Sequence, residues 1–183
     1  FKAIIEQVKK ETLTITDVVF IIAPRINAAG RMKHGNHAVT LLCETDTNLA
    51  AQYANEIDTY NSDRRDADKR ITIEALDQIE EHKEQEGFTT VVYKENWHKG
   101  VIGIVASRLI ETYYRPTLVF TKSGDVLAAS ARSVKGFDVY NALEQCSEFI
   151  EQFGGHKYAA GLTLLEANYG KFKAQFEKVV SET

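Results

Sequence analysis

The feature that most constrains this chain is a long stretch near its middle, residues 47–86, that contains no glycine and no proline. Apolar residues recur along it at intervals of three and four, which is the spacing of one buried helical face. About 40 residues of helix would extend ~60 Å, longer than a small domain needs, so the stretch predicts a helix that connects two domains. Its expected apolar face consists of Leu49, Tyr53, Ile57, Tyr60, Ile71, Ala75 and Ile79.

A charged cluster, DRRDADKR, occupies residues 63–70 of this stretch. Such a run is most simply a solvated helix face, and the sharper interpretation is a surface for a partner. Asp66 and Arg70 are four residues apart, a spacing that favours an ion pair on the helix surface.

The chain before residue 47 has the character of a helical domain that begins further upstream. Phe1 in place of Met predicts a piece cut from a longer protein. Residues 18–24 form an apolar run that is too short to distinguish a buried helix from a strand. Pro24, Gly30 and Gly35 then predict a loop, because both residue types interrupt regular structure.

After Gly87 the pattern alternates between β and α. Ser123-Gly124-Asp125 predicts a tight hairpin turn, and the alternation as a whole predicts an α/β fold with a mixed sheet. The expected domains are therefore residues 1–46, a long helix over 47–86 and an α/β domain over 87–183. Strands are expected at 88–94, 116–122, 126–134 and 161–166, and helices at 101–113, 137–150 and 168–180.

Composition excludes several classes of protein. The 183 residues carry a formal charge of −4, so nucleic-acid binding requires a local basic site. No apolar run reaches the ~18 residues of a membrane helix, and no membrane partner is expected. The two cysteines, Cys43 and Cys146, make no disulfide framework and no zinc cluster. Both are expected in the core, and the protein is expected in the cytoplasm.

Two short segments place arginine beside small or hydroxyl residues, a combination that suits phosphate binding. Arg25, Asn27 and Arg31 surround small residues that let a ligand approach the backbone. The alternative is a loop with surface arginines. Ser130 and Arg132 are two residues apart on an expected strand and so share one face. They form either a phosphate pocket or the polar face of an edge strand.

Two further segments are rich in glycine. Residues 97–108, WHKGVIGIVASR, follow a strand and open a helix, whose N-terminal N–H groups can face an anion. Gly154, Gly155 and His156 predict a loop that lies against a ligand. A purely structural turn is the alternative in both cases. The sequence contains no DHH or HxD cluster and no GxSxG elbow, so it gives little support for metal-dependent or serine hydrolysis within this chain.

In order along the chain, the segments APRINAAGRM, WHKGVIGIVASRL, RPTLVF, SARSVKGFDVYNAL and FGGHKYAAGLTL resemble the RecJ family of single-strand-specific 5′→3′ exonucleases. The resemblance runs from about residue 17 to residue 180. It implies a DHH-associated domain in the α/β part, preceded by a long connecting helix and by a helical remnant of a DHH domain.

The resemblance also implies that metal binding and substrate binding belong to different parts of the full-length protein. In that family the DHH domain binds Mn²⁺ or Mg²⁺ and activates water. Its motifs are absent here, so this fragment alone is expected to bind no metal and to be inactive. The implied partners are single-stranded DNA with a 5′ phosphate, the DHH domain in cis, and a single-strand-binding protein and helicase of DNA repair and recombination. The substrate-binding residues that it implies are Arg25, Asn27, Arg31, Ser130, Arg132, Gly154, Gly155 and His156.

Two alternatives stay open. One is a free-standing nucleic-acid-binding module. The other is a fragment of a related DHH-family oligoribonuclease or cyclic-dinucleotide phosphodiesterase, which shares the glycine–glycine–histidine ending. The extended segment WHKGVIGIVASR favours the RecJ family over the second alternative.

Overall fold

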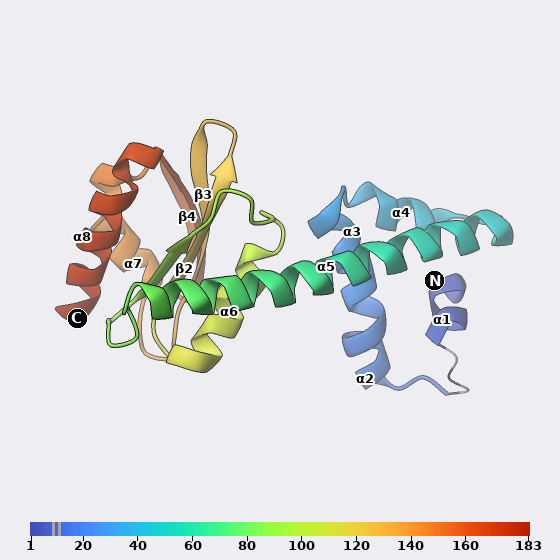
Figure 1. The fold of residues 1–183 in the computed structure, drawn as a ribbon. Coiled ribbons are helices and arrows are strands. Elements are labelled where there is room, and N and C mark those ends of the chain that lie inside the picture. Colours follow the sequence, from blue (N-terminus) through green and yellow to red (C-terminus); the bar gives the residue numbers. More distant parts are fainter. Residues whose placement is uncertain (9, 11) are drawn as a thin grey trace. The chain divides into compact units, whose positions relative to one another are not determined.

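The computed structural model describes residues 1–8, 10 and 12–183, and the chain divides into two compact units, residues 1–67 and 68–183 (Figure 1). The boundary falls within one long helix, α5 (Thr47–Glu81), which contributes residues to both units. The helix runs without interruption through Asn61 and the charged cluster that follows it.

Unit 1 is helical and packs around a small core that includes Ile4, Ile22, Leu41 and Ile57. Besides the start of α5, its elements are α1 (Lys2–Val8), α2 (Ile15–Asp17), the π-helix η1 (Val18–Ile22), α3 (Ala23–Met32) and α4 (Asn36–Cys43).

The loop predicted around Pro24 and Gly30 is wrong, because both residues lie within α3. Pro24 occupies the first turn of α3, where the missing proline N–H costs little. Gly30 is exposed close to the end of the helix, and Ala28 and Ala29 are fully buried against the core. The candidate residues of this segment are therefore side chains on a helix.

Asp17 stabilises the start of the helical run in unit 1. Its carboxylate accepts hydrogen bonds from the Thr14 backbone N–H at 3.0 Å and from the Thr14 hydroxyl at 2.8 Å, and it pairs with the Lys10 ammonium. The Lys10 contact, followed by the Thr14 contacts, lowers the pKa of Asp17 from 3.8 to about 2.

This lowered pKa gives unit 1 a defined acid sensitivity. A carboxyl whose pKa falls on folding contributes stability above its unfolded value of 3.8, and the contribution disappears as the pH falls through about 2. We expect Asp17→Asn to lower the free energy of unfolding at neutral pH and to flatten its decline in acid. Urea titrations followed by circular dichroism at several acidic pH values measure both effects, and an unchanged acid slope would contradict this role.

The predicted apolar stripe of α5 is confirmed in its central and C-terminal parts. Ile57, Ile71, Ala75 and Ile79 are each no more than 1% exposed. Leu49 is 42% exposed, so its placement in the buried face was wrong. Ile57 belongs to unit 1 and packs in its core, whereas Ile71, Ala75 and Ile79 belong to unit 2.

Asp68 departs from the expectation that the charged cluster 63–70 is solvated. It is 2% exposed, and both of its oxygens accept hydrogen bonds from Arg108, from Nε at 2.7 Å and from Nη2 at 2.8 Å. Such a two-pronged arginine–carboxylate pair fixes relative orientation as well as distance. It ties the α5 segment of unit 2 to α6 (Ile102–Tyr113).

Unit 2 is built on a five-stranded mixed sheet in the order β1-β2-β3-β5-β4. The first two strands are parallel and are joined by the crossover helix α6, whereas the remaining pairs are antiparallel. The predicted α/β class with a mixed sheet is confirmed. The strands are β1 (Thr90–Tyr93), β2 (Thr117–Ser123), β3 (Val126–Arg132), β4 (Gln152–His156) and β5 (Ala159–Leu164).

Helices cover the two faces of this sheet differently. Phe172, Phe176 and Val179 of α8 (Tyr169–Ser181), with α7 (Val139–Glu144), cover one face and form the main core with Phe120 and Leu162. On the other face, α6 contacts β2 and β3. On that second face, β5 and β4 present exposed glycines, so the sheet surface there is accessible.

Three expectations for unit 2 need correction. The helix predicted over 137–150 is shorter, because α7 ends at Glu144 and a 3₁₀ turn follows at Ser147–Phe149. The loop predicted at Gly154–His156 is the edge strand β4. The alternative that made Ser130–Arg132 part of an edge strand is wrong, because β3 is the central strand.

The cysteine prediction is half right. Cys146 lies in the core of unit 2, and burial raises the pKa of its thiol to about 11, so the group stays neutral at ordinary pH. Cys43 is exposed at the end of α4.

Across the described residues, no helix combines the length and the apolar character that a membrane crossing requires.

Candidate functional site

The register of the sheet brings together the candidate residues of unit 2. Ser130 pairs with Gly161 and Gly161 with Gly154, which makes one row across three strands. Arg132 pairs with Ala159 and Ala159 with His156, which makes the next row. Paired residues and residues two apart share a face. Ser130, Arg132, Gly154 and His156 therefore lie on one face of the sheet although they come from two distant segments.

Ser130 and Arg132 contact each other directly. Arg132 Nη1 donates to Ser130 Oγ at 2.9 Å and to the Ala131 carbonyl at 2.7 Å. Both side chains are half-buried. The guanidinium is thereby held beside a hydroxyl that both donates and accepts, which is a suitable pair for the oxygens of a phosphate.

Gly103 in the first turn of α6 makes this arrangement possible. A Cβ at this position would lie 2.8 Å from Arg132 Nη2 and 2.9 Å from Ser130 Oγ. Any other residue would displace the Ser130–Arg132 pair. The pair therefore lies against the N-terminal turn of a twelve-residue helix, and that end of a helix carries partial positive charge.

The start of α6 is fixed by Trp97 and His98. Trp97 is 3% exposed, its Nε1 donates to Glu74 at 2.7 Å, and its carbonyl accepts from the Thr121 hydroxyl at 2.6 Å. His98 Nδ1 accepts from the Gly100 N–H at 3.1 Å. The indole hydrogen bond is the main cause of the lowered pKa of Glu74. Both residues thus position the first turn of α6.

The backbone conformation and the close contacts at position 155 require glycine. Its φ is +150°, and a Cβ there would lie 2.3 Å from the Ala159 carbonyl oxygen. Next to it, His156 Nδ1 accepts from the Tyr158 N–H at 3.2 Å. A neutral imidazole bound in this way carries its proton on Nε2 and presents a donor there.

We expect Gly155→Ala to destabilise unit 2 by about 2 kcal/mol or more, because the methyl group meets the backbone of the paired strand. Gly154→Ala is the matched control, since a Cβ at Gly154 meets nothing within 4 Å. Urea unfolding followed by the fluorescence of Trp97, the only tryptophan in the chain, measures both variants. Equal stabilities would refute this explanation of Gly155.

A groove of about 530 Å³ lies over parts of β3, β5 and β4 and includes Gly161 and Gly154, the two glycines in the row that holds Ser130. The backbones of Gly154 and Gly161 form part of its lining, together with Gln152 and Thr163. Lys99 also lines it and donates to the Ser123 hydroxyl at 3.1 Å. Lys99 and Arg132 therefore bring positive charge to this face although the chain as a whole is acidic.

The candidate residues of unit 1 divide into two groups on α3. Asn27 and Arg31 are exposed and four residues apart, so they share one helix face. Arg25 is half-buried, its Nε lies 2.9 Å from an oxygen of Asp58, and its Nη1 donates to the Ile21 carbonyl at 2.8 Å. These contacts give Arg25 a structural role within unit 1.

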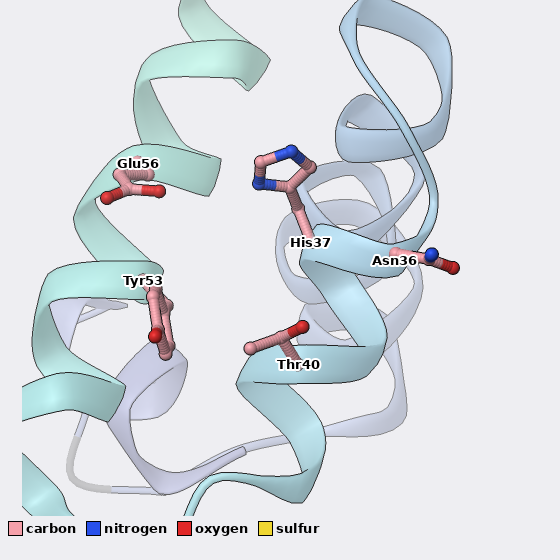
Figure 2. Close-up of a pocket in the computed structure, with 5 residues that line it drawn as sticks. All are labelled: Asn36, His37, Thr40, Tyr53 and Glu56. Carbon is pink, nitrogen blue, oxygen red and sulfur yellow. The ribbon is translucent and has the colours of Figure 1, made fainter.

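Unit 1 also has a pocket, of about 260 Å³, which lies between α4 and α5. Figure 2 shows the His37 ring extending from α4 toward Glu56, with Thr40 and Tyr53 below it. The His37 ring also packs edge-on against Tyr60 at 5.6 Å. Glu56 belongs to none of the candidate segments, and one imidazole with one carboxylate is fewer than the three protein ligands of a typical catalytic metal site.

No group of three or more histidine, cysteine, aspartate or glutamate side chains converges into a metal site in residues 1–8, 10 and 12–183. The residues present therefore do not fit the divalent metal pair that the family resemblance implied for the full-length enzyme.

Sequence reasoning missed three residues of this face: Lys99, Gly103 and Gly161. The segments containing them were identified, but their roles depend on the register of β5 and on how α6 packs against β3. The one available signal was glycine inside predicted regular structure, which often marks a close approach of backbone or ligand.

Comparison with known proteins gives consistent results. The DHHA1 domain family matches residues 85–182. The single-stranded-DNA-specific exonuclease RecJ of Bacillus subtilis is 36% identical over 171 residues, which are 91% of this chain and 21% of that protein. RecJ of Escherichia coli is 35% identical over an alignment of 191 positions, which covers 99% of this chain and 33% of that protein. The chain thus spans between a fifth and a third of the length of these relatives.

Solved structures of RecJ proteins are also similar to this chain. The crystal structure of RecJ with Mn²⁺ from Thermus thermophilus has a TM-score of 0.89 at 30% identity and covers 100% of this chain and 27% of that one. The crystal structure of an exonuclease RecJ bound to manganese has a TM-score of 0.88 at 30% identity. It covers 98% of this chain and 44% of that one.

Proposed function

Because the chain belongs to the DHHA1 domain family and is homologous to RecJ exonucleases, we propose that it is the strand-positioning part of a single-strand-specific 5′→3′ exonuclease. In this proposal unit 2 holds the terminal 5′ phosphate of the strand. Hydrolysis belongs to the part of the longer protein that this chain does not include. The cell compartment would be the cytoplasm, and the biological setting would be DNA repair and recombination.

The observation that carries the proposal is the Ser130–Arg132 pair against Gly103. The arginine is oriented by a hydroxyl at 2.9 Å, and the neighbouring glycine leaves no side chain between the pair and the first turn of α6. A terminal phosphate carries more negative charge than a diester, so it gains more from a charge-assisted contact with arginine. This favours recognition of a strand end over recognition of an internal phosphate.

The domain division expected from the sequence remains part of the proposal. Residues 1–46 would complete a DHH domain, residues 47–86 would connect it to the α/β domain, and residues 87–183 would bind the substrate. Asn27 and Arg31, on one exposed face of α3, would contact the strand from the DHH side. Positioning a substrate contributes to catalysis by holding the reacting bond in a productive geometry. A single-strand-binding protein and a helicase would act as partners.

Divalent metal would supply hydroxide and neutralise charge in the longer protein. The relatives whose structures were solved with Mg²⁺ or Mn²⁺ are RecJ proteins. The residues described here would hold the strand and would not ligate that metal.

Fluorescence anisotropy with this chain tests the proposal. A labelled single strand with a 5′ phosphate is compared with the same strand carrying a 5′ hydroxyl, with a duplex and with an RNA strand, in EDTA and at two salt concentrations. We expect the 5′-phosphorylated DNA strand to bind most tightly and its affinity to fall with salt. Equal affinity for phosphate and hydroxyl ends, or a preference for duplex, would contradict the proposal.

A further inference from the structure

The position of helix α6 on the sheet determines the geometry beside Ser130 and Arg132. A Cβ on Gly103, in the first turn of α6, would lie 2.8 Å from Arg132 Nη2 and 2.9 Å from Ser130 Oγ. The helix backbone therefore approaches this pair as closely as a glycine allows. A small shift of α6 toward the sheet would displace the pair, and a small shift away would leave it without support.

The apolar contacts of α6 do not fix this position by themselves. The helix contacts β2 and β3, and its buried side chains are Ile102, Val105, Ala106 and Leu109. Apolar contact is non-directional, so it holds the helix in place without setting its rotation or its position along its axis. A directional contact is needed for that.

A two-pronged ion pair provides the directional contact. Both oxygens of Asp68, on α5, accept hydrogen bonds from Arg108, on α6, at 2.7 Å from Nε and at 2.8 Å from Nη2. The side chain of Asp68 is only 3% exposed. Two parallel hydrogen bonds between a planar guanidinium and a planar carboxylate fix their orientation as well as their distance. The pair therefore opposes both rotation and sliding of α6.

Stability alone does not account for this buried pair. Taking two charges out of water costs free energy, and apolar residues of similar volume often stabilise a core as well or better. A two-pronged charged pair differs from such residues because it forms in one geometry only. Its specific contribution is therefore the placement of α6.

A second hydrogen bond from α5 fixes the segment that leads into α6. Glu74 accepts from Trp97 Nε1 at 2.7 Å. Asp68, Glu74 and their two partners all lie in unit 2. Gly103 lies between Trp97 and Arg108 in the sequence, so the first turn of α6 is fastened to α5 on both sides.

We propose that Asp68, acting through Arg108, is a positioning residue for the phosphate site. Arg108 follows Gly103 on the same helix, about 7.5 Å further along its axis. A displacement at Arg108 therefore moves Gly103 as part of one rigid helix and changes the support of the Ser130–Arg132 pair. This inference rests on the proposed function and extends the site by a residue that acts without contacting the strand.

Asp68→Asn tests this role. Asparagine keeps the size of the side chain but has one acceptor oxygen in place of two and no charge. Anisotropy titrations compare the variant and the parent on single strands with a 5′ phosphate and with a 5′ hydroxyl. We expect the preference for the phosphorylated strand to fall about five- to tenfold, because a misplaced contact group loses much of its effect. Affinity for the hydroxyl strand should stay within about twofold, the usual scatter for independent sites.

A double variant shows whether Asp68 acts through the phosphate pair. Arg132→Ala already removes the arginine contact with the phosphate, so adding Asp68→Asn to it should cause no further loss of affinity for the phosphorylated strand. Losses that simply multiply in the double variant would mean that Asp68 affects binding by another route, and they would overturn the proposal.

Two further variants separate positioning from general stability. Arg108→Lys keeps the charge beside Asp68 but loses the fork-shaped donor group. It should act like Asp68→Asn, and it replaces that variant if asparagine prevents folding. Lys173→Met is the control, because it breaks another ion pair of unit 2, with Glu84. It should lower the thermal midpoint and leave the phosphate preference unchanged; an equal loss of preference in this control would contradict a specific role of Asp68.

The outcomes distinguish this inference from the proposed function. If the parent prefers the 5′ phosphate and a folded Asp68→Asn variant keeps that preference, the positioning role is wrong and the proposed function stands. If the parent shows no preference for a 5′ phosphate, or binds neither strand, the proposed function fails and the positioning role fails with it.

Discussion

Arg132→Ala is expected to lower the affinity of this chain for a 5′-phosphorylated single strand by about ten- to a hundredfold, which corresponds to ~1–3 kcal/mol for a charge-assisted hydrogen bond. The loss should be confined to the phosphorylated strand. Affinity for the 5′-hydroxyl strand should change little, because that strand lacks the group that Arg132 holds. Anisotropy titrations of both strands against the variant and the parent measure the effect.

Two controls show whether the effect belongs to the guanidinium. Arg132→Lys keeps the charge but loses the fork-shaped donor group, so it should recover only part of the affinity. Arg70→Ala removes an exposed arginine of the charged cluster on α5 and should leave the phosphate preference intact. A fall in the affinity of Arg132→Ala that is equal for both strand ends would mean that Arg132 contributes general charge rather than end recognition.

The second large effect concerns stability. Arg115 is 7% exposed and holds the segment that follows α5. Its guanidinium donates to the carbonyls of Glu84, Gln85 and Gly87 at 2.8, 2.8 and 2.5 Å and to the Thr90 hydroxyl at 2.8 Å. It also lies over the Tyr113 ring, with Cζ 4.8 Å from the ring centre. Burial lowers the pKa of Arg115, so these partners compensate the cost of burying its charge.

We expect Arg115→Met to destabilise unit 2 by about 3 kcal/mol or more. Methionine fills much of the space but donates no hydrogen bond, and each carbonyl left without a partner costs roughly 1–3 kcal/mol. Urea unfolding followed by Trp97 fluorescence reports on this unit. Arg70→Met, at an exposed position, should change the free energy of unfolding by less than about 0.5 kcal/mol. Equal effects of the two variants would contradict the anchoring role of Arg115.

Periodicity and local chemistry were enough to predict much of the architecture. The absence of glycine and proline over residues 47–86 predicted α5, and the alternation after residue 86 predicted the mixed sheet. The two-residue spacing of Ser130 and Arg132 placed both on one face, and their hydrogen bond at 2.9 Å confirms it. The helix expected to begin near residue 137 is present as α7, and Asp138 caps it by accepting from the Asn141 N–H.

The errors arose where tertiary structure outweighs local preference. Gly154 and Gly155 favour a loop locally, yet pairing with β5 makes the segment a strand. Pro24 and Gly30 favour a break, yet a helix end tolerates both. Arg115 could not be distinguished from other arginines, because its partners are backbone carbonyls that only the fold places around it.

The arrangement of the candidate site could not be predicted from the sequence for the same reason. Ser130–Arg132 and Gly154–His156 were identified separately, and the sequence held no information on their register. Their arrangement in adjacent rows follows from the pairing of β3 with β5 and of β5 with β4. The place of Gly103 against Arg132 follows from the packing of α6 on β3.

In the function proposed above, unit 2 recognises the phosphate at the end of a single strand through Ser130 and Arg132. The most direct test is to map the amide and guanidinium NMR shifts of the isotopically labelled chain as a 5′-phosphorylated strand is added. We expect the largest changes at Ser130, Arg132 and Gly103, and we expect a 5′-hydroxyl strand to cause smaller changes at these residues. Changes concentrated instead on the exposed basic residues of α5, Arg65, Lys69 and Arg70, would contradict it.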